Sequence, residues 1–249
     1  MLIDTHVHLD MIQSPADAVR RARDAGVSKI VAVGTHLKSN RKTLDLGEQF
    51  PETVLPAIGY HPWAVVEKEV DETLRFVDAH LRSCIALGEV GLDYKIKVPK
   101  KIQQQVFESL LKIAAKHEKP VNVHSRYSFE RAFAMLRDAG VSKAVFHWYS
   151  GPLDMLERII NAGYFISATP ALAYSSRHQA AVKRTPIEHM LIETDAPEAY
   201  QGKTSEPATL VQTLEHLAWI KNVSIEEAAR STTENARFFY GIEAEKEGR

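Results

Sequence analysis

The chain begins with Met1-Leu-Ile-Asp-Thr-His-Val-His-Leu-Asp10, an apolar run that His6 and His8 close. Side chains alternate between the two faces of a β-strand, so His6 and His8 would project to the same side. Two imidazoles at the end of one strand suit a single metal ion. Two polar residues that merely end a strand have the same spacing, so the rest of the chain must decide between these interpretations.

Composition places the chain among ordinary globular proteins. It has 249 residues, 45% hydrophobic and 25% charged, which is enough apolar material for a sizeable core. A barrel commonly uses this length as one domain. The net charge of -1 excludes a chain-wide basic field, so any nucleic-acid partner would have to be held locally.

The cysteine count and the hydropathy pattern bear on location. The single cysteine, Cys84, excludes an internal disulfide and lies in an apolar run, where a buried, inert thiol is expected. No apolar run reaches the roughly 18 residues of a membrane span. No signal peptide is visible, and cleaving one would remove His6 and His8. We expect a cytoplasmic protein with no membrane association and no obligate protein partner.

Short β-rich runs alternate with amphipathic stretches along the whole chain. After the N-terminal strand, further strands are predicted at residues 29–34, 54–59, 84–89, 120–124, 143–147, 164–167 and 190–195. Helices are predicted between them, at residues 15–25, up to about 50, 71–81, 100–117, 128–139, 153–162 and 177–183. Two terminal helices follow, at residues 206–220 and 224–240. Ser224, with Glu227 three residues later, begins the last of these as a capping box.

This alternation predicts a single (β/α)8 TIM barrel, an α/β fold that spans residues 1–249 as one domain. The 249 residues shared among eight strand–helix pairs give about 31 residues per pair, the size of a βαβ repeat. The strands are continuous apolar runs, as expected when helices cover a parallel sheet. A doubly wound open sheet is the alternative, weakened because no Gly-x-Gly-x-x-Gly follows a strand.

Ionisable side chains stand at or just beyond the ends of most predicted strands. In a parallel barrel these carboxyl ends open onto one face, where active sites of this fold lie. The residues are His6 and His8 after the first strand, His61 after the third, Glu89 after the fourth, His124 after the fifth, His147 after the sixth and Asp195 after the eighth. Their convergence predicts a metal site at the mouth of the barrel.

Imidazoles and carboxylates together bind divalent ions such as Zn, Mn or Mg. We assign His6, His8, Glu89 and Asp195 to one ion, and Glu89, His124 and His147 to a second, with Glu89 as the bridge. Two such ions would activate a water to hydroxide, and Asp195 is the candidate general base. No Gly-x-Ser-x-Gly elbow is present, so nothing supports covalent acyl transfer.

Six motifs resemble the signature set of the TatD-type metal-dependent deoxyribonucleases, in order and over essentially the whole chain. They are Asp4-Thr-His-Val-His8, Gly59-Tyr-His-Pro62, Gly88-Glu-Val-Gly-Leu-Asp93, Pro120-Val-Asn-Val-His124-Ser-Arg126, His147-Trp-Tyr-Ser-Gly151 and Glu193-Thr-Asp-Ala-Pro197. The resemblance implies a hydrolase of the amidohydrolase-like barrel superfamily, with a two-metal site that matches our ligand assignment. It also implies nuclease activity, often exonucleolytic, on a DNA substrate held at the barrel mouth.

Two positions depart from the family pattern. A second histidine usually follows the His-Pro pair, where this chain has Trp63. The loop after Asp195 usually carries Arg-Asn-Glu-Pro, which here reads Thr204-Ser-Glu-Pro207. The metal ligands are unaffected, but the missing arginine weakens the case for a phosphate clamp in that loop.

Several other residues near the mouth have two interpretations. Asp4 either orients a ligand imidazole or packs at the strand end, and Asp93 either orients loops or a histidine or acts in catalysis. His61 and Arg126 are candidate substrate-binding residues, against loop packing and a surface ion pair. Trp63, Trp148 and Tyr149 either stack on bases or pack in the core. The remaining histidines, His178 among them, are expected to be structural or exposed.

Three functions remain compatible with the sequence. The first is a two-metal phosphodiesterase that removes nucleotides from a DNA end. The second is a metal-dependent amide or ester hydrolase acting on a small-molecule or aminoacyl substrate. The third is a non-catalytic metal-binding protein.

Overall fold

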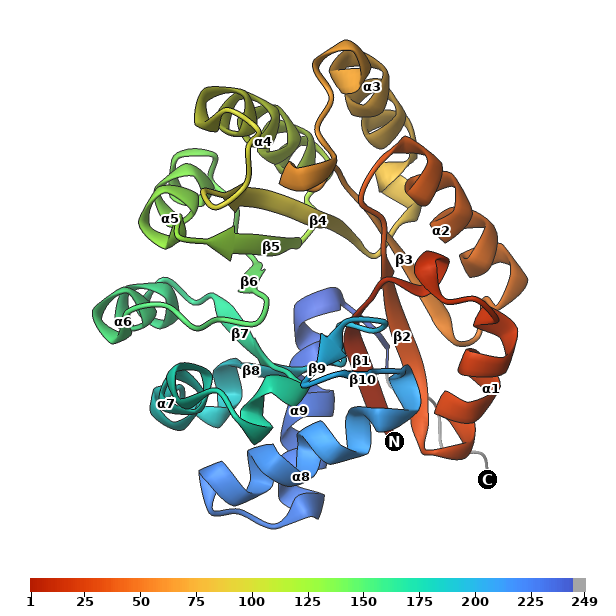
Figure 1. Ribbon diagram of the computed structural model, residues 1–249, viewed down its shortest axis with the longest axis vertical. Coiled ribbons are helices and arrows are strands. Elements are labelled where there is room, and N and C mark those ends of the chain that lie inside the picture. The colour runs from red at the N-terminus through yellow and green to blue at the C-terminus, as the bar shows by residue number, and fades with distance from the viewer. Residues whose placement is uncertain (244–249) are drawn as a thin grey trace.

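The computed structural model describes residues 1–243 and has the predicted barrel of eight parallel strands. Each strand is hydrogen-bonded to the next in chain order. Figure 1 shows them at the centre of the molecule, surrounded by helices. The strands are β1 (Leu2–Val7), β2 (Val27–Val33), β3 (Val54–Ile58), β4 (Ala86–Asp93), β5 (Val121–Arg126), β6 (Ala144–Phe146), β7 (Phe165–Ala168) and β8 (Met190–Ile192).

The barrel closes between β1 and the segment that follows β8. The backbone N–H of His8 donates to the carbonyl of Ala196 at 2.7 Å, and the N–H of Asp195 donates to the carbonyl of His6 at 3.0 Å. A parallel bridge joins Val7 to Ala196. This closure excludes the doubly wound alternative, because an open sheet has two unpaired edge strands.

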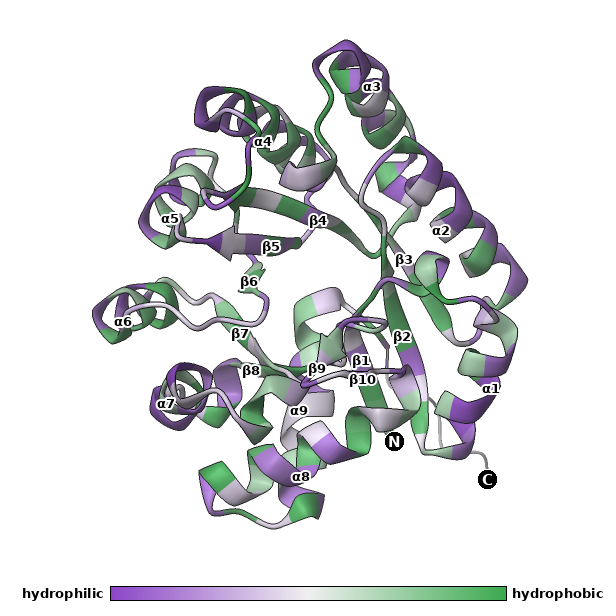
Figure 2. Ribbon diagram, in the orientation of Figure 1, coloured by the Kyte–Doolittle hydropathy of each residue, from purple (hydrophilic) through white to green (hydrophobic). Residues whose placement is uncertain are grey.

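One helix follows each of the first seven strands and covers the outside of the barrel, and an eighth follows β8. Their apolar faces turn towards the strands and their polar faces outward (Figure 2). They are α1 (Pro15–Asp24), α2 (Leu37–Gln49), α3 (Val70–His80), α4 (Lys100–Lys116), α5 (Phe129–Asp138), α6 (Leu153–Asn161), α7 (Ser176–Arg184) and α8 (Leu210–Lys221). Short 3-10 turns are η1 (Leu9–Met11), η2 (Pro62–Ala64), η3 (Glu67–Glu69), η4 (Leu81–Ser83), η5 (Pro170–Ala173), η6 (Ile187–His189) and η7 (Pro207–Thr209).

The last helix, α9 (Ile225–Tyr240), covers the end of the barrel where the strands begin. Thr233 donates to the carbonyl of Met1, which directly precedes β1, and Asn235 donates to the carbonyl of Met190, the first residue of β8. The side chains of Phe239 and Tyr240 pack with the apolar residues that fill the barrel interior. The opposite end, where the strands finish, is therefore the mouth.

The largest difference from the predicted boundaries is in β4, which extends to Asp93 rather than ending at Glu89. Its last residues pair with β5 up to Asp93 opposite Arg126, which also extends β5 past His124. Gly91 permits this close pairing: its φ is +148°, and a Cβ there would lie 2.0 Å from the carbonyl oxygen of His124. Asp93 therefore lies at the mouth, beside the predicted ligands.

The segment after β8 is also more divided than predicted. It forms a small hairpin of β9 (Ala199–Tyr200) and β10 (Lys203–Thr204), and the helix expected from residue 206 starts as η7 before α8. Ser224 is the N-cap of α9 as predicted, and its hydroxyl accepts from the N–H of Glu227 at 3.1 Å, which is one of the two bonds of the predicted capping box. Within residues 1–243, no helix has both the length and the apolar content that a bilayer crossing requires.

Candidate metal centre

All seven ionisable residues predicted at the strand ends lie together at the mouth. His6 is in β1, Glu89 in β4 and His124 in β5, so regular strand geometry fixes their directions. The remaining four lie just beyond strands: His8 after β1, His61 after β3, His147 after β6 and Asp195 after β8. Most of these side chains are buried, with His8 and His124 partly exposed.

The first cluster consists of one donor atom each from His6, His8, Glu89 and Asp195. The Nε2 atoms of His6 and His8 are 3.4 Å apart, and Oε2 of Glu89 lies 3.4 Å from both. Oδ1 of Asp195 lies 3.6 Å from the first nitrogen and 3.4 Å from the second. Ligands at roughly 2.0–2.2 Å from a tetrahedral zinc are about 3.3–3.6 Å from one another, so these spacings fit one such ion.

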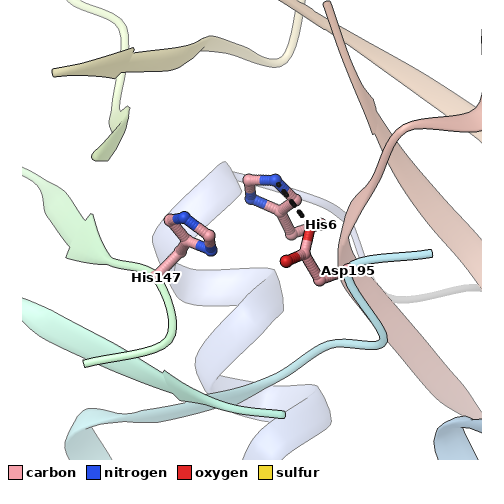
Figure 3. A group of neighbouring side chains, drawn as sticks. All are labelled: His6, His147 and Asp195. Carbon is pink, nitrogen blue, oxygen red and sulfur yellow. Dashed lines mark ion pairs between the residues drawn. The ribbon is translucent and has the colours of Figure 1, made fainter. Parts of the chain in front are cut away.

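The second cluster consists of Glu89, His124 and His147. Oε1 of Glu89 lies 3.0 Å from Nδ1 of His124 and 2.9 Å from Nε2 of His147, and the two nitrogens are 3.3 Å apart. Glu89 thus presents a different oxygen to each cluster. The ring of His147 stacks on that of His6 at 4.3 Å, and Figure 3 shows both rings with Asp195 around the same space.

The hydrogen positions on three of these imidazoles follow from their outer partners. Nδ1 of His6 lies 3.1 Å from Oδ1 of Asn122, Nδ1 of His147 lies 3.3 Å from Oε1 of Glu193, and Nε2 of His124 lies 3.3 Å from Oδ2 of Asp93. Each partner oxygen accepts a hydrogen bond, so the ring proton is on the outer nitrogen and a lone pair faces the cluster. Lone pairs and carboxylate oxygens this close are stable together around a cation, so the donor set fits a metal ion.

The charge balance agrees with this donor geometry. Burial alone would raise the pKa of Glu89, but the histidines around it, His61 and His147 foremost, hold that pKa well below its usual value. Burial alone would lower the pKa of His147, but Glu89 and Glu193 hold it well above its usual value. The first shift keeps Glu89 ionised, and the second means that the carboxylates around His147 favour a positive charge at that position.

His61 lies as close to Glu89 as the cluster members do, but its proton faces the other way. The backbone N–H of Trp63 donates to Nδ1 of His61 at 3.2 Å, which leaves the ring proton on Nε2, 3.3 Å from Oε1 of Glu89. Burial lowers the pKa of His61 to about 3, so the ring is neutral near pH 7. His61 can therefore donate a hydrogen bond from Nε2 at the metal centre.

Asp4 does not contact the ring of His6. Its carboxylate instead accepts from the N–H of Thr194 at 3.0 Å and from the Thr194 hydroxyl at 2.6 Å, next to Asp195. Burial raises the pKa of Asp4 well above its usual value despite these bonds. Of the two roles weighed for Asp4, the structure shows strand-end packing, which ties β1 to the Asp195 segment.

Two residues that contact ligand imidazoles did not stand out in the sequence, Asn122 and Glu193. Both are polar residues within apolar strand runs, Val121-Asn122-Val123 and Leu191-Ile192-Glu193. A polar residue at such a position requires a buried partner, which is the signal that would have identified them.

Arg126 forms a two-pronged ion pair with Asp93, with Nε 3.0 Å from Oδ1 and Nη2 2.8 Å from Oδ2. The Arg126 side chain is 49% exposed, whereas Asp93 is buried. Asp93 thus connects Arg126 to His124. Arg126 makes an ion pair, as one of its two interpretations predicted. The exposed part of its side chain faces solvent at the mouth.

Comparison with known proteins shows the family to which the chain belongs. The sequence profile of the TatD related DNase family matches residues 3–241. The human protein named Deoxyribonuclease TATDN3 is 31% identical, over 94% of this chain and 93% of its own length. The Bacillus subtilis protein YabD, described as an uncharacterized metal-dependent hydrolase, is 28% identical, over 97% of this chain and 100% of its own.

A solved structure gives the same result. The crystal structure of the TatD homologue YJJV from Escherichia coli superposes with a TM-score of 0.88 and 26% identity, over 97% of this chain and 98% of that one. Family profile, sequence relatives and solved structure agree, and the chain belongs to the TatD-related DNase family of metal-dependent hydrolases.

Proposed function

We propose that this protein is a two-metal phosphodiesterase that hydrolyses DNA from an end. His6, His8, Glu89 and Asp195 hold one divalent ion, and Glu89, His124 and His147 hold the other. One observation carries the proposal: the two oxygens of Glu89 face different clusters, each within 3.4 Å of the nitrogens of that cluster. Glu89 would thus offer one oxygen to each ion, and two ions held in this way would supply the metal-assisted chemistry of two-metal phosphoester hydrolases.

When bound, the ion pair supplies a water that loses its proton near neutral pH and a counter-charge for the phosphoryl oxygens. Asp195 accepts that proton on Oδ2, the oxygen that does not face His6 and His8. Burial alone would raise the pKa of Asp195, but His8 and His6 hold it below its usual value. The carboxylate is therefore ionised and able to accept a proton.

His61 and Arg126 are assigned to the substrate. His61 is neutral and presents its Nε2 proton at the centre, so it donates a hydrogen bond to an oxygen of the scissile phosphate or of the leaving group. Arg126 is held by Asp93 with half of its side chain exposed, so its remaining N–H groups can bind a phosphate.

The same chemistry also serves attack of a water on a carbonyl carbon, so amide or ester hydrolysis is the competing activity. The test is elemental analysis of the purified protein, paired with turnover of an end-labelled oligonucleotide and of an aminoacyl ester under Zn, Mn and Mg. We expect two ions per chain and stepwise shortening of the oligonucleotide.

Hydrolysis of the ester without shortening of DNA would contradict the substrate assignment. If both activities survived addition of a chelator, the metal assignment would be wrong. Glu89→Gln should lose at least one ion, because the amide leaves a single oxygen where each of the two clusters needs one. His216→Asn is the matched control, since within residues 1–243 the hydrogen bond of the His216 side chain is to the carbonyl of Gln212 on its own helix.

A further inference from the structure

A cavity of about 1200 Å³ lies beside the metal centre at the mouth of the barrel. Its walls are the loops after β4, β5 and β6, the first turns of α5 and α6, and one face of α7. Arg126 lines the cavity and pairs with Asp93, which contacts His124 of the second cluster. Only the carboxylate of Asp93 and the ring of His124 thus connect the cavity wall at Arg126 to the proposed metal position.

The lining of the cavity is basic, although the chain as a whole has a net charge of -1. Five basic side chains line it, namely Lys95, Arg126, Arg131, Arg158 and Arg177. The acidic lining residues are Glu130 and Asp154. Such a concentration of one charge beside a catalytic centre attracts a polyanion.

Salt bridges compensate only part of this charge. Arg158 pairs with Glu130 at 2.6 Å. Across residues 1–243, Lys95 and Arg177 have no acidic partner within ion-pair distance, and both side chains are exposed. Arg131 is also exposed, on the first turns of α5. Three exposed cations of the cavity lining, Lys95, Arg131 and Arg177, are thus available to phosphates.

The cavity is larger than a small-molecule substrate requires. Pockets for such ligands occupy roughly 300–1,000 Å³ and contain only a small number of charged or polar groups. A volume of about 1200 Å³ with five cations suits a segment of a polymer better than one small ester or amide.

Tyr127 adds an aromatic surface at the rim. It directly follows Arg126, its side chain is 65% exposed, and its φ of +56° lies in the left-handed region that few non-glycine residues adopt. An exposed ring beside a row of cations is the arrangement on which the bases of a single strand stack.

We propose that this basic cavity binds the DNA strand on one side of the scissile phosphate, with Arg131, Arg177 and Lys95 on successive phosphates and Tyr127 stacked on a base. The proposal rests on the phosphodiesterase function proposed above. Arg126 would contact the phosphate nearest the centre, and the strand would continue from there between α5 and α7.

The test uses the metal-loaded enzyme, with Arg131→Gln/Arg177→Gln as the main variant and Arg230→Gln as its matched control. Arg230 is an exposed arginine on α9, at the other end of the barrel. Binding of a fluorescent oligothymidylate is measured by anisotropy at several salt concentrations. We expect the slope of log K against log salt to fall by about 0.7 for each phosphate contact removed, so by about 1.4 for the double variant.

Tyr127 is tested by the same binding measurement. Tyr127→Ala should weaken binding about fivefold to a hundredfold and Tyr127→Phe much less, because a phenyl ring still stacks. A double variant with the salt slope of Arg230→Gln, or an alanine variant that binds as the wild type does, would overturn the proposal. Unfolding temperatures of all variants exclude loss of fold as the cause.

Turnover separates this proposal from the proposed function. The ratio of kcat/KM for an oligonucleotide to that for bis(p-nitrophenyl) phosphate, which is too short to reach α7, should fall in the double variant and stay constant in Arg230→Gln. An enzyme that hydrolyses neither substrate contradicts the phosphodiesterase function, and the anisotropy series still decides whether the cavity binds a strand.

Discussion

Oδ2 of Asp93 lies 3.3 Å from Nε2 of His124, so a buried carboxylate fixes the orientation of an imidazole at the metal centre. The other nitrogen of that ring faces Glu89 at 3.0 Å. Outer carboxylates of this kind set the tautomer and raise the basicity of a histidine ligand.

The first prediction follows from this contact. Asp93→Asn should weaken binding of the second ion about 10–100-fold while the first ion is retained, because only His124 loses its carboxylate partner. Competition titration with a chromophoric chelator measures both affinities. Asp138→Asn, at an exposed position on α5, is the control, and equal loss of both ions would contradict the separation of the two clusters.

Asp195→Asn tests the general base. The amide keeps an oxygen for the first cluster but cannot take up a proton, so most metal should remain while kcat falls about 10²–10⁴-fold. Metal content and single-turnover cleavage are measured on the same preparation. Unchanged turnover would remove Asp195 from the mechanism.

Removal of metal should destabilise the protein. The donor atoms converge without protons between them, so only the folded chain can bind an ion there. Such binding raises the free energy of unfolding by about 2.7 kcal/mol when the free ion is at a hundred times its Kd. Thermal unfolding with chelator and after readdition of Zn or Mn measures the shift. Glu89→Gln should show a smaller response than the wild type, and a wild-type protein indifferent to chelation would argue against a folded metal site.

The exposed Trp63 lies beside His61, and we expect it to contribute to substrate binding there. Its ring lies 5.0 Å from that of His61 and is 49% exposed. One stacked base contributes roughly 1–3 kcal/mol, so Trp63→Ala should raise KM for an oligonucleotide about fivefold to a hundredfold. Trp63→Phe should raise it less, because a phenyl ring still stacks. Trp219→Ala, at a residue 77% exposed on α8, is the control and should leave KM unchanged.

His178 predicts a pH dependence of stability away from the centre. Nε2 of His178 accepts from the N–H of Thr169 and Nδ1 donates to the carbonyl of Tyr149, so the buried ring is neutral. Burial lowers its pKa from 6.5 to about 4. Between these values only the unfolded chain takes up the proton, so stability is full above about pH 6.5 and falls as the pH drops towards 4, by at most about 3 kcal/mol.

His178→Gln isolates that contribution. At pH 8 the variant should be less stable than the wild type, because it lacks the hydrogen bonds of the neutral His178 ring. The difference in free energy of unfolding between the two proteins should become smaller towards pH 4.5. Urea denaturation at each pH gives the two curves. Parallel curves across this range would show that His178 does not titrate between them.

The alternation of strands and helices was predictable because each buried strand is a continuous apolar run, and a run of this kind requires cover on both faces. The position of the ligands was predictable for a related reason. His6, Glu89 and Asp195 stand at or just after runs whose carboxyl ends a parallel barrel gathers at one face.

The partners of those ligands were not predictable in the same way. Whether Asn122 reaches His6 depends on the register of β5 against its neighbours, which hydropathy does not encode. The length of β4 depends on Gly91 tolerating the backbone of β5, a close contact between residues distant in sequence. The proton position on His61 depends on one backbone N–H, that of Trp63.

The two clusters differ in how much of the chain must be assembled to form them. The second cluster takes its donors from residues 89 to 147, within three consecutive strands, whereas the first joins residues 6 and 195 across the seam where the barrel closes. Contacts between such distant residues carry the largest loop-closure cost and form late in folding. An ion bound at the first cluster would therefore link β1 to the segment after β8. Its occupancy would show whether the barrel has closed between them.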